Sequence, residues 1–178
     1  RFEVPQQRWT ALAEEGRGAA VLNDCKYGVN VVGEAIQLTL LKSALAPDPH
    51  ADEGEQRFTY SLYTWNGSLL ESGLVQEAYD LNAPATVAAG RPVLPQQSLF
   101  AVDAANVMID TVKPAEDGSG DVIVRLYEAK RTATRCTLST SLPARSAALA
   151  DMLENHRAEL PVRDGRMTLD LRPFEIVT

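Results

Sequence analysis

Short apolar runs with a period of two, separated by glycine, proline and polar turns, constrain the fold of this chain more than any other feature. Apolar and polar residues alternate over 36–40 and again over 57–64. Residues two apart point to the same side of a β-strand, so each run is expected to form a strand with one apolar face. A chain built mainly of such runs is expected to fold as stacked antiparallel sheets.

Further strands are expected wherever the same pattern recurs. The additional ranges are 8–15, 19–24, 29–41, 107–111, 122–128, 131–140, 167–171 and 174–177. Glycine-bearing loops at 16–18 and 113–120 are typical of hairpin connections between them. The segment 147–154 fits one or two helical turns, but its type stays open. The number of short strands predicts an all-β, antiparallel β-sandwich.

One segment departs from the period of two. Leu70, Leu74, Ala78 and Leu81 are three or four residues apart, which predicts a short helix over 69–81. A proline-rich stretch follows, and proline cannot donate a hydrogen bond to a sheet. We therefore expect two domains, at residues 1–96 and 97–178.

Charge and composition exclude several classes of protein. The formal net charge of -7 argues against nucleic acid, which is bound by clustered Lys and Arg. No apolar run approaches the ~18 residues that a membrane span needs, and the start of the chain has no signal-peptide pattern. Cys25 and Cys136 are far apart and form no metal or disulfide motif, so a reducing, cytoplasmic location is expected.

Reactive side chains gather at Asp24, Cys25 and Lys26. A cysteine nucleophile needs a lowered thiol pKa and a positioned base, and only His50 and His156 are available as histidine partners. On a strand, Cys25 would point away from both charged neighbours. The competing interpretation is therefore a small buried side chain beside a surface ion pair.

The densest set of oxygen ligands lies in "DPHADEGEQ", residues 48–56. It holds Asp48, His50, Asp52, Glu53 and Glu55 around Gly54. The spacing is not that of an EF-hand, and zinc sites use more nitrogen or sulfur ligands than one histidine. The alternatives are a weak site for a hard cation and a solvated acidic loop, which the pattern favours.

The spacing of acidic residues in the sequence does not identify a catalytic pair for glycoside hydrolysis. Glycoside hydrolysis needs two facing carboxylates, and 24 acidic residues offer too many pairs. The aromatic residues that could stack on sugar rings are Trp9, Tyr27, Tyr60, Tyr63 and Trp65. Such residues serve more often in core packing.

Several pieces in fixed order resemble one enzyme family. These are "LNDCKYG", "LLKS" followed by "PDP", "ADEGE" before "FTYSLY", and later "SLFAVDAANVMIDTVKPAEDGSGDVIVRLYEA" and "RPFEIVT". Together they resemble the C-terminal region of family 38 glycoside hydrolases, the α-mannosidases, in their bacterial and vacuolar or cytosolic branch. The resemblance covers essentially the whole chain.

The resemblance implies part of a mutarotase-like supersandwich followed by a small terminal sandwich. Family members are zinc-dependent retaining α-mannosidases whose catalytic residues and zinc ligands lie in an N-terminal domain that this chain is expected to lack. No catalytic residue, metal ligand or cofactor is therefore assigned here. The expected partners are that catalytic domain and a mannoside. The expected cleft-rim residues are Asn23, Asp24, His50, Asp52, Glu53 and Glu55.

Three functions remain open from the sequence. The first is a non-catalytic portion of an α-mannosidase that lines the cleft. The second is an independent carbohydrate-binding module with Trp9 or Trp65 as an exposed platform. The third is a cysteine hydrolase centred on Cys25. An incomplete sheet would also expose an edge, which invites pairing with a second copy or with a further segment of the parent.

Overall fold

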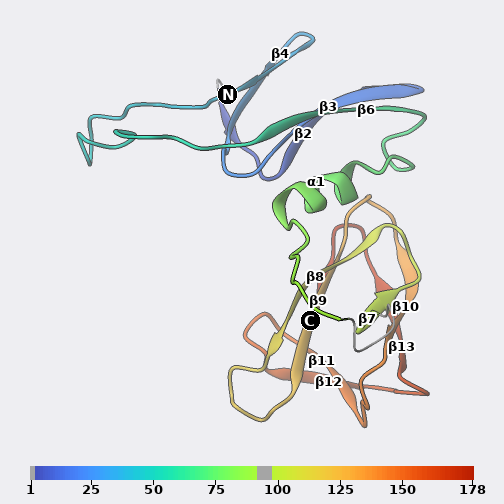
Figure 1. Ribbon diagram of the computed structural model, residues 1–178. Helices are drawn as coiled ribbons and strands as arrows, with labels where there is room; N and C mark the ends of the chain where they lie inside the picture. Colours follow the sequence, from blue (N-terminus) through green and yellow to red (C-terminus); the bar gives the residue numbers. More distant parts are fainter. Residues whose placement is uncertain (1–2, 92–97) are drawn as a thin grey trace. The chain divides into compact units, whose positions relative to one another are not determined.

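The computed structural model describes residues 3–91 and 98–178. The chain divides into two compact units, Arg1–Ala89 and Gly90–Thr178, and each is considered separately (Figure 1). The domain boundary predicted at residues 96 and 97 lies outside the described residues. Within the described ranges, no helix is long and apolar enough to cross a membrane.

In the N-terminal unit, the described residues from position 3 onward form six strands and a helix. These are β1 (Val4–Pro5), β2 (Trp9–Glu14), β3 (Arg17–Asn23), β4 (Gly28–Val32), β5 (Ala35–Leu38), β6 (Tyr60–Asn66) and α1 (Leu74–Asn82). The strands form two antiparallel sheets, in the orders β1-β4-β5 and β2-β3-β6. The predicted hairpin around Gly16 is confirmed, with Arg17 paired to Glu14.

Helix α1 covers one face of the β2-β3-β6 sheet. The buried cluster there joins Leu22 and Trp65 of the sheet to Leu74 and Ala78 of the helix. Close packing explains the glycine at position 18, because a Cβ there would overlap the Trp65 ring. The sheet and the helix therefore share one apolar core.

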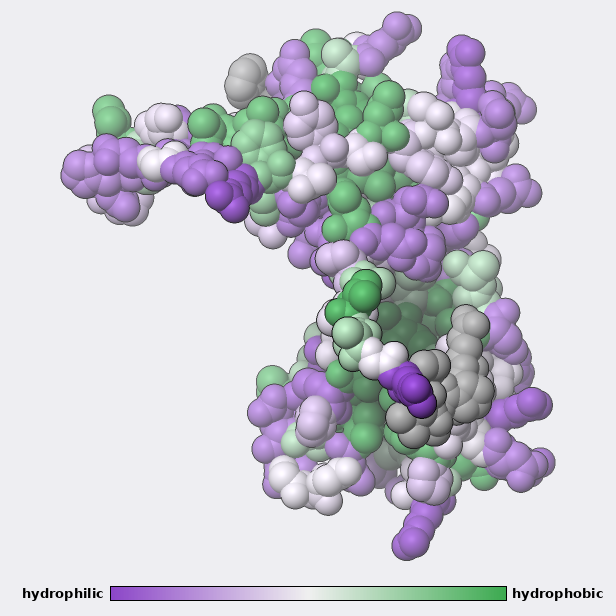
Figure 2. All heavy atoms as spheres, viewed as in Figure 1, coloured by the Kyte–Doolittle hydropathy of each residue, from purple (hydrophilic) through white to green (hydrophobic). Residues whose placement is uncertain are grey.

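The other face of this sheet carries both apolar and polar residues and is exposed mainly along the edge strand β6, whereas Thr10 and Val21 are half-buried. Thr10, Val21 and Leu62 lie opposite one another across the three strands. Leu62 is 72% exposed and Tyr60 is 62% exposed. The apolar set predicted over 57–64 does lie on one face, but the larger Tyr63 and Trp65 occupy the face toward the helix. Figure 2 shows hydrophobic side chains among polar ones on the visible surface of this unit.

Two sequence predictions in this unit were wrong in extent. The predicted strand 29–41 is a hairpin, because Gly33 at φ 57° allows a tight turn between β4 and β5. The helix predicted from residue 69 begins at Leu74, because Ser72 and Gly73 interrupt it. Ser72 Oγ donates to the Leu69 carbonyl at 2.8 Å, a local bond that competes with helix formation.

Residues 98–178, the described part of the C-terminal unit that holds strands, form eight of them. These are β7 (Phe100–Val102), β8 (Val107–Pro114), β9 (Val122–Glu128), β10 (Thr134–Thr140), β11 (Ala147–Ala150), β12 (His156–Leu160), β13 (Arg166–Leu171) and β14 (Ile176–Val177). They form antiparallel sheets in the orders β13-β10-β7, β14-β9-β8 and β11-β12. The predicted β8-β9 hairpin is confirmed, and its turn uses Gly118 at φ 71° and Gly120 at φ 86°.

The core of this unit lies between two of its sheets. Val107 and Leu126 from β8 and β9 pack with Leu138 and Leu169 from β10 and β13. The predicted all-β sandwich is therefore confirmed, with α1 as the single α-helix of the described residues. The segment 147–154, whose type the sequence left open, begins with strand β11, which pairs with β12.

A buried carboxylate organises the end of this unit. Glu128 is fully buried and accepts hydrogen bonds from Asn106 Nδ2 at 2.8 Å, Lys130 N at 2.7 Å and Phe174 N at 3.0 Å. Burial raises the pKa of Glu128, but the bonds from Phe174, Asn106 and Lys130 outweigh it and lower that pKa overall. One charged side chain thus joins β9 to two loops.

Candidate functional site

The turn at residues 23–28 connects β3 to β4 and is fixed from inside the unit. Asn23 is buried, and its Oδ1 accepts a hydrogen bond from Lys26 N at 2.8 Å. The Asn23 carbonyl accepts one from Asn82 Nδ2, at the end of α1, at 3.0 Å. Asn23 therefore holds the turn in place and is not presented to solvent as a cleft-rim residue would be.

Asp24 links this turn to the start of β6. Its Oδ1 accepts a hydrogen bond from Thr59 N at 2.9 Å, and its own N–H donates to Thr59 O at 3.2 Å. Hydrogen bonds from the Cys25 thiol and the Thr59 amide lower the pKa of Asp24. The carboxylate is therefore held ionised at the base of the loop that precedes β6.

Cys25 is exposed, contrary to the expectation of a small buried side chain, because β3 ends at Asn23 and the chain bends there. Hydrogen bonding to the Asp24 carboxylate and burial raise the pKa of the Cys25 thiol. Sγ makes a weak contact with Arg57 O at 3.8 Å. Because a nucleophile needs a lowered pKa, this environment argues against a cysteine hydrolase.

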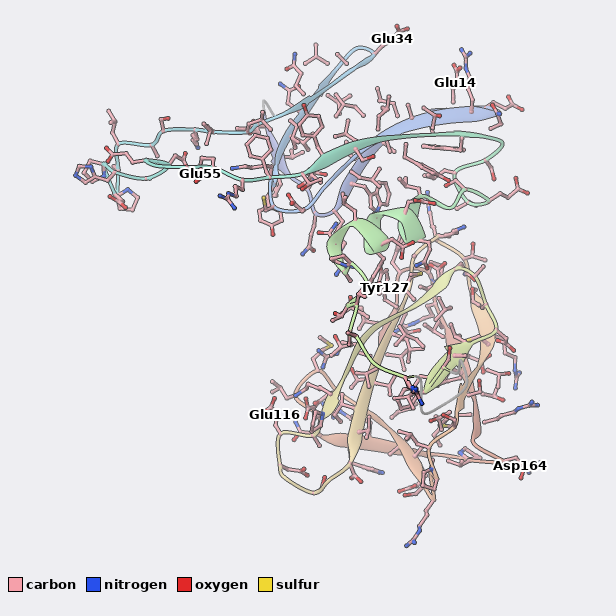
Figure 3. The ribbon with its side chains drawn as sticks, viewed as in Figure 1. Glu14, Glu34, Glu55, Glu116, Tyr127 and Asp164 are labelled. Carbon is pink, nitrogen blue, oxygen red and sulfur yellow. The ribbon has the colours of Figure 1, made fainter. Side chains whose placement is uncertain are left out.

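Loop 39–59 extends away from the sheets of its unit and carries the acidic residues (Figure 1). Its outer part is strongly hydrophilic in Figure 2. His50 Nδ1 lies 2.9 Å from Glu53 Oε1, and Glu55 pairs with Arg57 at 2.8 Å. Figure 3 shows Glu55 on this extended loop.

The acidic side chains of this loop do not converge on one point. In residues 3–91 and 98–178, no three His, Cys, Asp or Glu side chains are arranged to hold a metal ion. These residues therefore do not fit a zinc site. The pairs His50–Glu53 and Glu55–Arg57 are those of a solvated surface loop.

Asp52 has a different role from its acidic neighbours. Its Oδ2 accepts hydrogen bonds from Ser43 N at 2.9 Å and from Lys42 N at 3.1 Å. These two backbone bonds lower the pKa of Asp52, and the charge of Lys26 adds to the effect. Asp52 thus ties the returning part of the loop to the residues that follow β5.

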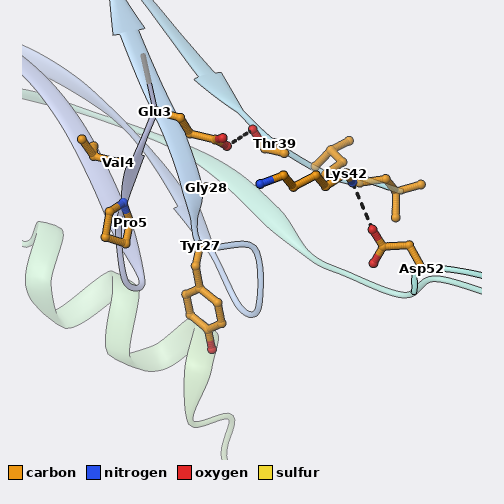
Figure 4. Close-up of a pocket in the computed structure, with 10 residues that line it drawn as sticks. Glu3, Val4, Pro5, Tyr27, Gly28, Thr39, Lys42 and Asp52 are labelled. Carbon is orange, nitrogen blue, oxygen red and sulfur yellow. Dashed lines mark hydrogen bonds between the residues drawn. The ribbon is translucent and has the colours of Figure 1, made fainter. Parts of the chain in front are cut away.

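A pocket of about 430 Å³ lies beside this tie (Figure 4). It is formed by the N-terminal segment, the end of the turn at 27–28 and the start of loop 39–59. The lining residues are Glu3, Val4, Pro5, Tyr27, Gly28, Thr39, Leu40, Leu41, Lys42 and Asp52.

The polar groups of the pocket are held in defined positions. Thr39 Oγ1 donates a hydrogen bond to Glu3 Oε1, which orients that carboxylate (Figure 4). Gly28 leaves room for it, because a Cβ at that position would overlap Glu3 Oε1. Tyr27 is 53% exposed and borders the same pocket. The pocket thus combines an aromatic side chain, a carboxylate and the Lys42 ammonium.

The structure brings together only some of the predicted rim residues. Asp52 lines the pocket and Asp24 belongs to the adjoining turn, whereas His50, Glu53 and Glu55 are not among the lining residues. Tyr27 stood among the aromatic candidates of the sequence. Glu3, Thr39 and Lys42 were missed, because the antiparallel pairing of β1 and β5 with β4 brings them together and no local motif marks them.

The chain is thus a two-unit β-sandwich protein whose candidate site lies in one turn, residues 23–28, and one loop, residues 39–59. Residues 106–178 match the "Glycosyl hydrolases family 38 C-terminal beta sandwich domain", and residues 1–50 match the "Glycosyl hydrolases family 38 C-terminal domain". The chain belongs to glycoside hydrolase family 38 and corresponds to C-terminal domains of that family.

The sequences of known proteins match this chain over its whole length. It is 40% identical to human "Alpha-mannosidase 2C1" and 34% identical to "Alpha-mannosidase G" of Dictyostelium discoideum, over 100% of this chain in both cases. It spans only 18% and 17% of those proteins, respectively. An α-mannosidase structure from Enterococcus faecalis V583 superposes with a TM-score of 0.76 at 21% identity, over 99% of this chain and 21% of that one. This last likeness concerns the fold.

Proposed function

We propose that this chain is a non-catalytic C-terminal β-sandwich portion of a zinc-dependent, retaining α-mannosidase of the cytoplasm. Family membership and the names of its relatives support an α-mannosidase as the parent. The relatives are more than five times as long as the stretch matched here, which leaves room for a catalytic domain elsewhere. The zinc and the nucleophile are proposed to lie there, since the described residues offer no fitting ligand set.

The uncovered face of the β2-β3-β6 sheet is the observation that carries this proposal. Its exposed apolar side chains are Leu62, 72% exposed, and Tyr60, 62% exposed, both on the edge strand β6 beside the half-buried Val21. Burying one such side chain stabilises a protein by roughly 1.5–3 kcal/mol, and this stabilisation is absent while the face is exposed to water. Sandwich sheets bury such faces against a second sheet about 10 Å away. We infer that another part of the parent enzyme covers this face.

The turn 23–28 and loop 39–59 are proposed to contribute to the wall of the active-site cleft. Both are polar, both are anchored by backbone hydrogen bonds to Asp24 and Asp52, and they meet at a concave pocket. Mannoside substrates would meet this wall after the catalytic domain is in place.

The alternative, an independent carbohydrate-binding module, was expected to use Trp9 or Trp65. Trp65 is only 8% exposed, and Trp9 packs against the same buried cluster. Neither tryptophan therefore offers the exposed platform on which that hypothesis depended. The module hypothesis in its tryptophan form is disfavoured.

Leu62→Lys tests the interface in two forms of the protein, the 178-residue chain and a longer form that restores upstream sequence. The substitution should leave the urea midpoint of the short chain nearly unchanged, because Leu62 is exposed there. In the longer form it should destabilise by at least about 2 kcal/mol, because a charge would be buried on an apolar face. Leu153→Lys, in an exposed loop of the other unit, is the matched control. Equal, small effects of L62K in both forms would contradict the interface.

A further inference from the structure

A second pocket, of about 520 Å³, lies on the exposed face of the β10-β13 pair in the C-terminal unit. Its volume is that of a small-molecule site. Five of its six lining residues are polar or charged, and two of them are arginines. The lining residues are Thr137, Pro161, Arg163, Asp164, Arg166 and Thr168. This composition suits a charged, water-soluble ligand.

A tight turn places the two arginines side by side. Arg163 and Arg166 are joined by backbone hydrogen bonds of 3.0 and 2.9 Å. Between them, Asp164 at φ 50° and Gly165 at φ 70° form the left-handed pair typical of a two-residue hairpin, and Figure 3 shows Asp164 at its tip. Residues opposite one another in such a pair have Cα atoms about 5.5 Å apart and point to the same face. Because the next residue, Met167, is buried in the core, both arginines point to the outer face.

This pair of like charges is unfavourable while the pocket holds no ligand. Like charges directly opposite one another on a sheet repel and destabilise it. Within the described ranges 3–91 and 98–178, no acidic side chain forms an ion pair with Arg163 or Arg166. Arg135, on the same outer face, is instead paired with Asp170 at 3.8 Å. The two guanidinium groups therefore offer unused, planar sets of donors, which match the oxygens of a phosphate.

We propose that this pocket binds a phosphate group, presented as the free ion or as a small phosphomonoester. Arg163 and Arg166 donate hydrogen bonds to the phosphate oxygens, and the negative charge of the ligand relieves the repulsion between them. The Thr168 hydroxyl donates a further bond, because Thr168 follows Arg166 by two residues on β13 and shares its face. This ligand is additional to the proposed role of the chain in an α-mannosidase and does not depend on it.

Two aspartates lie near the arginines, and only one of them opposes an anion in the pocket. Asp103 is engaged elsewhere, because its Oδ1 accepts a hydrogen bond from Thr137 N at 2.7 Å. Asp164 lines the pocket, and no described residue forms an ion pair with it. Its charge repels an anionic ligand, so Asp164→Asn should strengthen phosphate binding several-fold. Asparagine tolerates the positive φ at this position, so the turn is retained.

The test is a titration of the 178-residue chain with inorganic phosphate and, separately, with phenyl phosphate, followed by amide resonances. Chloride keeps the ionic strength low and constant, because screening alone alters surface charges. We expect saturable shifts at Gly165, Arg166 and Thr168, with a Kd in the millimolar range. Arg163→Gln and Arg166→Gln should each weaken binding about tenfold, since each removes charge-assisted donors. Arg135→Gln is the matched control on the same sheet face outside the pocket, and it should leave binding nearly unchanged.

Tighter binding of phenyl phosphate would support the pocket as a site for a phosphate carried on a larger molecule, and tighter binding of the free ion would support inorganic phosphate. Shifts that do not saturate, or equal weakening by Arg163→Gln and Arg135→Gln, would overturn the proposal, because the chain would then respond only to overall charge. Weaker binding by Asp164→Asn would also contradict it. None of these results bears on the proposed role of the chain, which is tested by Leu62→Lys and by activity of the longer form.

Discussion

Glu128→Gln tests whether a buried carboxylate holds the C-terminal unit together. The substitution keeps the shape of the side chain and removes its charge. Glutamine can still accept the bonds from Asn106 and Lys130 through one oxygen, but its NH2 group would face the N–H of Phe174. The N–H of Phe174 is thereby left without its acceptor, next to a fully buried side chain at position 128.

The expected magnitude follows from these three bonds. A hydrogen bond to a charged group contributes roughly 1.5–3 kcal/mol and a neutral one about 1 kcal/mol. Losing the bond from Phe174 and weakening the bonds from Asn106 and Lys130 should together destabilise the unit by about 4 kcal/mol. The burial that opposes ionisation of Glu128 is relieved in the variant and offsets part of this loss. We expect a net destabilisation of about 2–3 kcal/mol.

Urea unfolding followed by amide resonances of β9 and β10 measures this directly. For a unit of this size, with a urea dependence of about 1 kcal/mol per molar, the midpoint should fall by about 2 M. Glu159→Gln is the control, because the Glu159 side chain is exposed and pairs with His156 at 3.0 Å; it should change stability by less than about 0.5 kcal/mol. Equal midpoints for Glu128→Gln and the unmodified chain would refute the reasoning.

The pH dependence gives a second readout. Because the folded pKa of Glu128 is lowered, its contribution is present above the ordinary glutamate pKa and is lost as the pH falls through the folded value. The stability difference between the unmodified chain and Glu128→Gln should therefore shrink on acidification. A difference that stays constant through this range would contradict the lowered pKa.

Three further predictions follow from individual contacts. Gly18→Val should destabilise the N-terminal unit by about 2–3 kcal/mol and shift the Trp65 fluorescence, whereas Gly90→Ala, with open space around it, should be neutral. Asp52 should titrate below an ordinary aspartate, and the two backbone amides that it caps should lose protection from hydrogen exchange only as the pH falls through that value. Cys25 should react with iodoacetamide at neutral pH more slowly than a model peptide thiol, because the neighbouring carboxylate raises its pKa, and faster reaction would reopen the nucleophile hypothesis.

The sequence predicted correctly those elements that depend on neighbouring residues alone, such as hairpins with glycine turns. The β2-β3 and β8-β9 hairpins follow from turn glycines between alternating runs. The period of two also placed Tyr60 and Leu62 on one face of a strand. It could not say which face the helix would cover, because the choice depended on packing of Trp65 against Gly18 from another strand.

The candidate site was predictable only in part, for the same reason. Asp24 and Asp52 stood out in the sequence as acidic residues. Their carboxylates accept hydrogen bonds from the backbone N–H groups of Thr59 and Ser43, respectively, and no sequence motif marks those two donors. The pocket depends on Glu3 lying beside Thr39, although these residues are 36 apart in sequence. Tertiary pairing of the strands creates that proximity.

The non-catalytic role of the 178-residue chain is tested by assaying its hydrolysis of a chromogenic α-mannoside beside a longer form that restores upstream sequence. Both should be assayed with added zinc and at equal molar concentration. We expect turnover in the longer form and none above background in the short chain. Turnover by the short chain, abolished when its own acidic residues are substituted, would contradict a non-catalytic role.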